Sequence, residues 1–118
     1  MSEKLKEQIN LAWENRASLS PKTKGIDRDA IESSIAGLDN GSLRVASRLD
    51  DGQWLVNQWI KKAVLLGFRI HPNVVMDGGP QNGKFFDKVA NKFSGWSETD
   101  FSKAGFRVVP PATVRKGA

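Results

Sequence analysis

The segment from residue 58 to residue 68 constrains the fold more than any other part of this sequence. Its apolar residues cover almost the whole circumference of a helix, interrupted only by Lys61 and Lys62. They are Trp59, Ile60, Ala63, Val64, Leu65, Leu66 and Phe68. A helix that is apolar nearly all round must be largely buried. We therefore predict that 58–68 is the central helix of a small domain.

Other elements are predicted around this helix. Apolar residues recur at helical spacing over 3–16, and a second helix is expected from an N-cap at Asp27 to a stop at Asn40-Gly41. Alternation over 43–56, interrupted by the turn residues Asp50-Asp51-Gly52, predicts a β-hairpin. Ser97 with Asp100 resembles the cap of a short helix, 98–104. The expected fold class is α+β, mainly helical: a small helical domain with a β-hairpin.

The region between residues 69 and 97 is less regular. Val74 to Met76 is compatible with a short strand, and a loop is expected from Asp77 to Gly83. The apolar residues that follow are expected to anchor this segment on the core, although they do not decide its secondary structure. They are Phe85, Phe86, Val89 and Phe93.

Composition excludes several classes of site. The 118 residues contain no Cys and a single His, so disulfides, thiol nucleophiles and multi-histidine metal sites are ruled out. No apolar stretch of about 18 residues is present, and the N-terminus lacks the apolar core of a signal peptide. We therefore expect a soluble cytoplasmic protein that binds no membrane.

Charge is distributed unevenly along the chain. Residues 1–53 hold 8 Lys/Arg and 9 Asp/Glu, whereas residues 54–118 hold 10 and 4, so the net charges of −1 and +6 add to the total of +5. Nine of the ten aromatic residues also lie in the second stretch. A basic, aromatic-rich half suggests nucleic acid, or small anionic ligands such as dicarboxylates and phosphates. Solvated lysines around an apolar core explain the same composition equally well.

Most candidate motifs have a simpler explanation. Gly78 to Lys84 fits the pattern of a phosphate-binding P-loop, but Phe85 stands where that motif needs Ser or Thr, so we expect a surface loop. His71 precedes Pro72 and is expected to be a turn residue. Lys61 and Lys62 are adjacent, so at least one stem must cross apolar surface, either to reach water or to contact an anion.

Arg107 is the candidate binding residue. It lies in the run Phe106 to Val109, immediately before the rigid pair Pro110-Pro111. Strand alternation places Phe106 and Val108 on one face and Arg107 on the other. A guanidinium held between apolar neighbours suits a carboxylate, which it can bind with two parallel hydrogen bonds. A salt bridge to a nearby Asp is the alternative, and the pattern does not decide between them.

Several blocks together resemble a known family. They are 35–46, 51–54, 58–66, 86–89, 92–93 and 105–111. In this order and spacing they closely resemble the N-terminal region of the tetrahydrodipicolinate N-succinyltransferases. The most specific parts are Trp-Ile-Lys-Lys-Ala-Val-Leu-Leu at 59–66 and Gly-Phe-Arg-Val-Val-Pro-Pro at 105–111. The resemblance runs from the first helix to Ala118. The loop Asp77 to Gly83 is longer and richer in Gly than in some members.

The resemblance implies a function for the parent protein. Members of the family are acyltransferases of the succinylase branch of diaminopimelate and lysine biosynthesis. They transfer a succinyl group from succinyl-CoA to the amino group of a ring-opened dicarboxylate, without metal or covalent cofactor. They are homotrimers whose catalytic body is a left-handed β-helix of hexapeptide repeats. The resemblance places the substrate-contacting residue of the N-terminal region on Arg107.

The same resemblance limits what this chain contains. The family's catalytic aspartate and CoA site lie in the β-helix, beyond Ala118, so no catalytic, cofactor-binding or metal-binding residue is assigned here. We expect an N-terminal helical domain over 1–109, a connector over 110–118 toward the β-helix, and no activity for the chain alone. Rival interpretations are a small basic nucleic-acid-binding module, since helices followed by a hairpin mimic a winged helix, or a stand-alone interaction domain.

Overall fold

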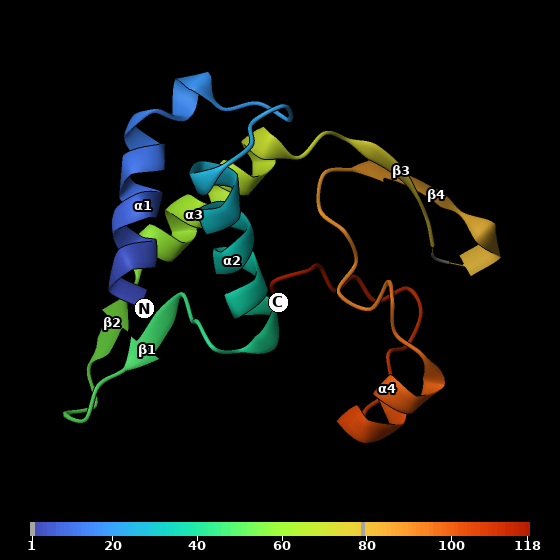
Figure 1. Ribbon diagram of the computed structural model, residues 1–118. Helices are drawn as coiled ribbons and strands as arrows, with labels where there is room; N and C mark the ends of the chain where they lie inside the picture. Colours follow the sequence, from blue (N-terminus) through green and yellow to red (C-terminus); the bar gives the residue numbers. More distant parts are fainter. Residues whose placement is uncertain (1, 79) are drawn as a thin grey trace. The chain divides into compact units, whose positions relative to one another are not determined.

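The computed structural model of the chain describes residues 2–78 and 80–118. Their contacts form two compact units, drawn in Figure 1. The helical unit runs through Pro72 and includes Gly117, and the C-terminal unit comprises Asn73–Lys116 with Ala118. The predicted α+β, mainly helical class is confirmed, because the described residues form four α-helices and two small antiparallel hairpins. The boundary predicted between 109 and 110 stays a prediction, because nothing in the described residues tests it.

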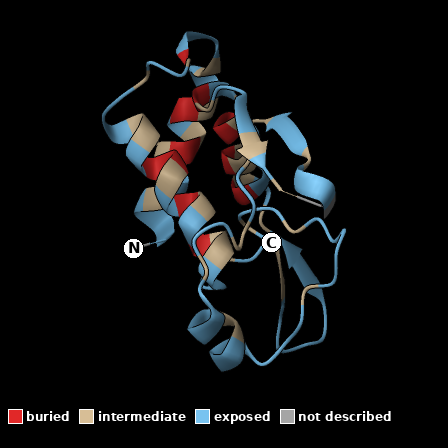
Figure 2. Cartoon of the chain, turned by 90° about the vertical axis from the view of Figure 1, so that its right-hand side faces the viewer, coloured by how far each residue is buried: buried red, intermediate tan, exposed pale blue. Residues whose placement is uncertain are grey.

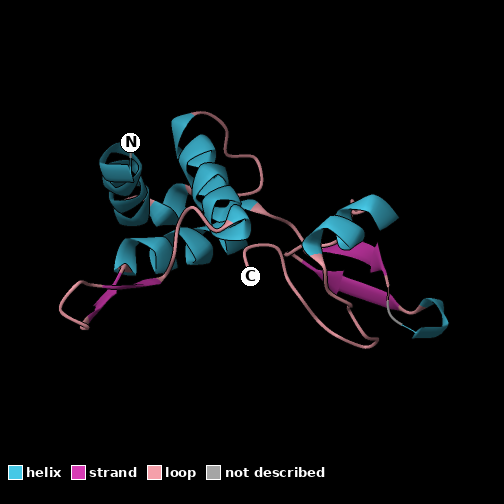
Figure 3. Ribbon diagram, turned by 90° about the horizontal axis from the view of Figure 1, so that it is seen from below, coloured by secondary structure: helices cyan, strands magenta, loops and turns pink. Residues whose placement is uncertain are grey.

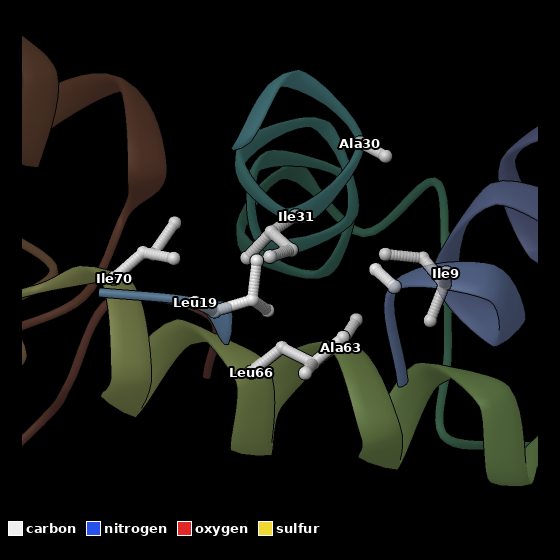
Figure 4. Close-up of a cluster of buried hydrophobic side chains, with 8 residues drawn as sticks. Ile9, Leu19, Ala30, Ile31, Ala63, Leu66 and Ile70 are labelled. Carbon is white, nitrogen blue, oxygen red and sulfur yellow. The ribbon is translucent and has the colours of Figure 1, made fainter. Parts of the chain in front are cut away.

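A shared apolar cluster holds the helical unit together. Its helices are α1 (Ser2–Glu14), α2 (Ile26–Asn40) and α3 (Gln58–Ile70), and a short 3₁₀ turn, η1 (Arg16–Ser18), follows α1. Figure 4 shows Ile31 pointing from α2 toward Leu19 and Leu66. The buried members of the cluster are Ile9, Ala12, Leu19, Ala30, Ile31, Ala63, Leu66 and Ile70. The three helices therefore depend on one another for burial of their apolar faces.

α3 is the central helix, as predicted, but it buries only one face. It packs against both α1 and α2, and its buried residues recur at helical spacing: Ile60, Ala63, Leu66, Gly67 and Ile70. The opposite face, with Lys61, Leu65 and Arg69, is exposed. Lys62 is half-buried, and its Nζ donates a hydrogen bond to Oδ1 of Asn10 at 3.2 Å. A protein side chain is thus the partner of Lys62.

α2 differs from the prediction at its start. Gly25, with φ of 85°, occupies the N-cap, and Asp27 lies inside the first turn, where its Oδ1 accepts a hydrogen bond from Nε2 of Gln8 at 2.7 Å. The predicted cap at Asp27 is therefore wrong, because its carboxylate contacts α1 rather than the end of its own helix. The predicted stop is confirmed: Gly41 is left-handed, and its N–H donates to the carbonyl of Leu38.

Arg28 joins the start of α2 to the end of α3. Its Nε donates to the carbonyl of Thr23 at 2.5 Å, and its Nη2 donates to the carbonyls of Pro21 at 2.9 Å and Ile70 at 2.8 Å. The last carbonyl groups of a helix have no partner within the helix. One guanidinium thus satisfies an orphan carbonyl of α3 and fixes the turn that precedes α2.

The predicted first hairpin is present. Strands β1 (Ala46–Arg48) and β2 (Trp54–Val56) are antiparallel, with Ser47 opposite Leu55. The backbone N–H of Asn57 donates to the carbonyl of Val45 at 2.8 Å, which ties the base of the hairpin to the start of α3. All three residues of β2 are exposed.

The C-terminal unit contains a second hairpin that the sequence pattern did not predict. Strands β3 (Val74–Asp77) and β4 (Lys84–Asp87) are antiparallel, joined through the 3₁₀ turn η2 (Pro80–Asn82), and α4 (Glu98–Ala104) follows. Figure 3 distinguishes both hairpins from the helices. The expected strand at Val74 to Met76 is confirmed, extended by Asp77.

Phe85 and Phe86 do not anchor this segment on a core. Their side chains are 55% and 69% exposed, so the predicted anchoring role is wrong for both. Adjacent strand residues point to opposite faces, so the two exposed phenylalanines lie on opposite faces of this two-stranded hairpin. Figure 2 shows the contrast, with buried residues in red on the helices and exposed residues along β3 and β4.

The two neighbouring leucines of α3 provide a test of the core. Replacing Leu66 by Ala removes a fully buried side chain from the shared cluster, so the free energy of unfolding is expected to fall by about 2–5 kcal/mol. Leu65→Ala, at a position 41% exposed, is the matched control and is expected to cost about 0.5 kcal/mol or less. Urea unfolding followed by circular dichroism measures both, and equal costs would contradict the one-sided burial of α3.

Candidate functional site

A cluster of aromatic rings surrounds the segment that carries Arg107. The centroid of the Phe93 ring lies 4.8 Å from that of Trp96, 5.4 Å from that of Phe101 and 5.8 Å from that of Phe106. Trp96 also lies 5.0 Å from Phe101 and 6.0 Å from Phe106. Edge-on and tilted ring pairs at these distances are attractive. The cluster therefore fixes Phe106, the residue next to Arg107.

α4 is locked at both ends. At its start the Ser97 side chain accepts from the backbone N–H of Asp100, and the Asp100 carboxylate accepts from the backbone N–H of Ser97, which is the predicted capping box. At its end Gly105, with φ of 77°, is left-handed, and its N–H donates to the carbonyl of Phe101. The predicted cap and the predicted end of this helix at residue 104 are both confirmed, so the path of the chain toward Arg107 is set by local sequence.

Arg107 presents its guanidinium to solvent. The side chain is exposed, and it makes no hydrogen bond or ion pair with any residue in 2–78 or 80–118. Its neighbour Val108 is half-buried, and just beyond it the N–H of Ala112 donates to the carbonyl of Val109 at 2.9 Å, closing a turn over the Pro110-Pro111 pair. The alternative of a salt bridge to a nearby Asp is not found among the described residues.

Two other basic residues of the C-terminal unit have acidic partners. Nη2 of Arg115 donates to Oδ2 of Asp87 at 2.6 Å, and Lys84 forms an ion pair with Asp77 across the second hairpin. The backbone N–H of Lys88 and, after it, the Arg115 guanidinium hold the pKa of Asp87 below its ordinary value. Arg107 differs from Arg115 and Lys84 in having its charge available to a ligand.

The Gly-rich segment is a hairpin connection. Gly79 lies outside the described residues, but the N–H of Gly78 donates to the carbonyl of Gly83 at 3.1 Å, and Lys84 pairs with Asp77. In a phosphate-binding loop these N–H groups and this lysine would face the ligand. The expectation of a surface loop is therefore confirmed for residues 78 and 80–83, whereas Asp77 ends strand β3.

His71 belongs to the structural network at the end of α3. Its Nε2 lies 2.7 Å from Oε1 of Glu32, the carboxylate that also pairs with Arg28 at 3.3 Å. Within the described part of the chain, no three acidic or His residues gather where they could hold a metal ion. None of the helices formed by residues 2–78 and 80–118 is long and apolar enough to cross a membrane.

The sequence pattern does not reveal the aromatic cluster. It predicts that Phe93 reaches a core, but it does not group Phe93 with Trp96, Phe101 and Phe106. The available signal was the placement of aromatic residues before, within and just after the capped helix 98–104. A short helix with fixed ends holds the residues before and after it close together, so aromatic rings at these positions can contact one another.

Comparison with known proteins identifies one family along the chain. Residues 4–70 match the family model described as "Tetrahydrodipicolinate N-succinyltransferase N-terminal". A Roseobacter denitrificans protein named "2,3,4,5-tetrahydropyridine-2,6-dicarboxylate N-succinyltransferase" is 58% identical over 114 residues, which is 97% of this chain and 42% of the relative. A Maricaulis maris protein of the same name is 56% identical over 110 residues, 93% of this chain and 40% of the relative.

The extent of these matches bears on the site. A Bordetella pertussis protein, also of that name, is 56% identical over 115 residues, 97% of this chain and 41% of the relative. The chain thus spans about two fifths of the length of the curated relatives it matches. More than half of each relative has no counterpart here, and any site completed by that part lies outside this chain.

The Asp87–Arg115 contact predicts a titration. Because the pKa of Asp87 is lower in the folded chain than in the unfolded chain, its contacts stabilise the folded state above about pH 4. This contribution disappears as the pH falls through the folded-state pKa. Carbon-13 NMR of the Asp87 carboxyl is expected to give a midpoint below about 3.9.

Arg115→Ala separates the two causes of that shift. The midpoint of Asp87 is expected to rise but to stay below the unperturbed value, because the Lys88 N–H remains. Lys116→Ala, a neighbouring exposed position, is the charge-matched control and is expected to leave the midpoint in place. A midpoint indifferent to Arg115→Ala would show that the ion pair does not form in solution.

Proposed function

Because this chain belongs to the tetrahydrodipicolinate N-succinyltransferase family, we propose that it is the N-terminal part of a succinyl-CoA-dependent N-succinyltransferase. In this proposal the parent enzyme acts in the diaminopimelate branch of lysine biosynthesis, in the cytoplasm and as a homotrimer. The match of residues 4–70 to the N-terminal model supports it, as do relatives of this name at 50–58% identity.

We assign acceptor binding to Arg107. The observation that supports this role is an exposed guanidinium without a protein partner among the described residues, next to a phenylalanine fixed in the aromatic cluster. A dicarboxylate acceptor offers planar anionic groups that match the fork of N–H donors on arginine. The remaining positive charge of residues 54–118 would raise the local concentration of the dianion and of anionic succinyl-CoA.

The chemical step itself is assigned to the part of the protein outside this chain. The acceptor amine attacks the thioester carbonyl, a C–N bond forms, the C–S bond breaks, and CoA leaves as the thiol. A carboxylate acting as general base takes the proton of the amine and passes it to the departing sulfur. No catalytic residue, metal or cofactor is assigned here, and this chain contributes binding of the acceptor.

A role in assembly is assigned to the first hairpin. Trp54 and Val56 lie on one of its faces and Leu55 on the other, and all three are exposed. Exposed apolar side chains concentrated on one projection are typical of subunit contacts. We therefore place β1 and β2 at a boundary between subunits of the proposed trimer.

The nucleic-acid-binding alternative receives no support from the charged residues of the helices. α3 exposes Lys61 and Arg69, which are two turns apart, while Lys62 is bonded to Asn10 and Arg28 of α2 to backbone carbonyls. A recognition helix needs several cations and amides on one exposed face. The small-anion interpretation therefore stands as the proposal.

The role of Arg107 can be tested in a fusion protein. In it, this chain replaces the matched 114-residue stretch of the Roseobacter denitrificans relative. Arg107→Ala removes a charge-assisted contact worth about 1.5–3 kcal/mol, so KM for the dicarboxylate is expected to rise about 10- to 100-fold. KM for succinyl-CoA is expected to change little, and steady-state kinetics with each substrate varied in turn measures both.

Two controls accompany this measurement. Arg44→Ala removes an exposed guanidinium from the helical unit and is expected to leave acceptor kinetics unchanged. Arg107→Lys keeps the charge without the planar fork and is expected to recover only part of the loss. Acceptor kinetics equal in the Arg107→Ala and unsubstituted fusions would remove Arg107 from the site.

The chain by itself is expected to be catalytically silent. It contains none of the groups to which the proposal assigns the chemical step. Incubation of the 118-residue protein with succinyl-CoA and the acceptor should release no CoA above the background hydrolysis, as followed with a thiol reagent. Acceptor-dependent release of CoA by this chain alone would overturn the division of labour proposed here.

A further inference from the structure

The second hairpin exposes an apolar pair of side chains on one of its faces. Val75 on β3 and Phe86 on β4 are cross-strand partners, and their side chains are 67% and 69% exposed. The pair Asp77–Lys84 lies at the loop end of the same face, where its two side chains form an ion pair. An isolated two-stranded hairpin is marginally stable in water and needs a layer packed on it.

The C-terminal unit does not supply that layer. Of the residues from 73 to 118 whose burial the structure describes, none is buried. The aromatic cluster draws its rings from Phe93, Trp96, Phe101 and Phe106, so it lies outside the hairpin. The helical unit, by contrast, has a dry cluster of its own. A unit of this size without a buried core gains too little from burial to be stable alone.

The matches to relatives indicate where the missing layer comes from. The N-terminal family model ends at residue 70, close to the unit boundary between Pro72 and Asn73. Identity to the Roseobacter denitrificans relative nevertheless covers 97% of this chain, and the matched stretch is only 42% of that relative. The hairpin thus lies beyond the N-terminal model but within the stretch that matches the relative, and most of the relative has no counterpart here.

We propose that the Val75–Phe86 face of β3 and β4 docks on the part of the parent polypeptide that lies outside the matched stretch. The hairpin then forms a structural unit with that part. The surface that receives it is apolar opposite Val75 and Phe86 and polar opposite the Asp77–Lys84 pair. This inference rests on the proposed function only in taking the chain as part of such a longer protein.

The size of the face favours a segment of the same polypeptide over a second copy of this chain. Stable interfaces between separate proteins bury about 800 Å² on each partner. Val75 and Phe86, even with the edges of Val74 and Phe85, offer only a few hundred Å², because a buried aromatic side chain contributes about 150–250 Å². A covalently connected partner is present at high effective concentration, so a small face suffices.

Hydrogen exchange on the fusion protein described above tests this docking. Backbone amides of β3 and β4 are expected to exchange at least 10-fold more slowly in the fusion than in the 118-residue chain, with the amides of α3 as the internal reference for folding. Phe86→Ser in the fusion is expected to abolish the difference, and Val75→Ser to reduce it. Leu11→Ser, at another exposed apolar position, is the matched control and should preserve the difference.

The possible outcomes distinguish between the partners that could cover the Val75–Phe86 face. Equal exchange of the hairpin in the fusion and the 118-residue chain would overturn the proposal. Protection in the 118-residue chain that grows with protein concentration would replace the docked segment by a second copy. CoA release by the fusion is measured in parallel: an active fusion with an unprotected hairpin refutes only the docking, and an inactive fusion with a protected hairpin refutes only the proposed function.

Discussion

The close packing of α2 on the buried face of α3 is the contact on which the helical unit depends. Gly67 of α3 leaves room for the end of the Ile35 side chain, because a Cβ at this position would lie 2.9 Å from Cδ1 of Ile35. Gly37 likewise leaves room for Leu43, where the chain turns back after α2: a Cβ at Gly37 would lie 2.6 Å from Cδ1 of Leu43. With the helices this close, Ile31 and Leu66 share one dry cluster with Ile9 of α1.

The two units are stabilised by different kinds of interaction. In the helical unit, burial of aliphatic side chains provides the dominant favourable term. In the C-terminal unit, ring contacts, the capping box of α4 and the backbone hydrogen bonds that pair 90–92 with 114–116 hold a chain whose side chains stay partly in water. The acceptor-binding role proposed for Arg107 therefore lies in the unit with the weaker core.

Local signals in the sequence predicted most elements. The periodicity of 58–68 identified α3, the Asp50-Asp51-Gly52 turn identified the first hairpin, and Ser97 with Asp100 identified α4. Each of these signals acts within a few residues, so no tertiary information was needed. The cap at Asp27 failed because its carboxylate bonds to Gln8, 19 residues away, and sequence spacing contains no information about such a contact.

Local sequence signals do not predict the second hairpin or the surroundings of Arg107. Phe85 and Phe86 are consecutive apolar residues, a pattern that fits an anchored segment as well as a strand with both faces open. For Arg107, alternation could place the side chain on a face but could not say whether an aspartate stood opposite. The family resemblance, not periodicity, favoured a ligand there.

The hydrogen bonds of Arg28 respond to temperature differently from the apolar core of the helical unit. The bonds from its guanidinium to Thr23, Pro21 and Ile70 are directional and charge-assisted. Hydrophobic stabilisation weakens on cooling, whereas such bonds do not depend on the ordering of water around apolar groups. On cooling, the hydrogen bonds of Arg28 between the turn before α2 and the end of α3 should therefore weaken less than the stabilisation provided by the apolar cluster beside them.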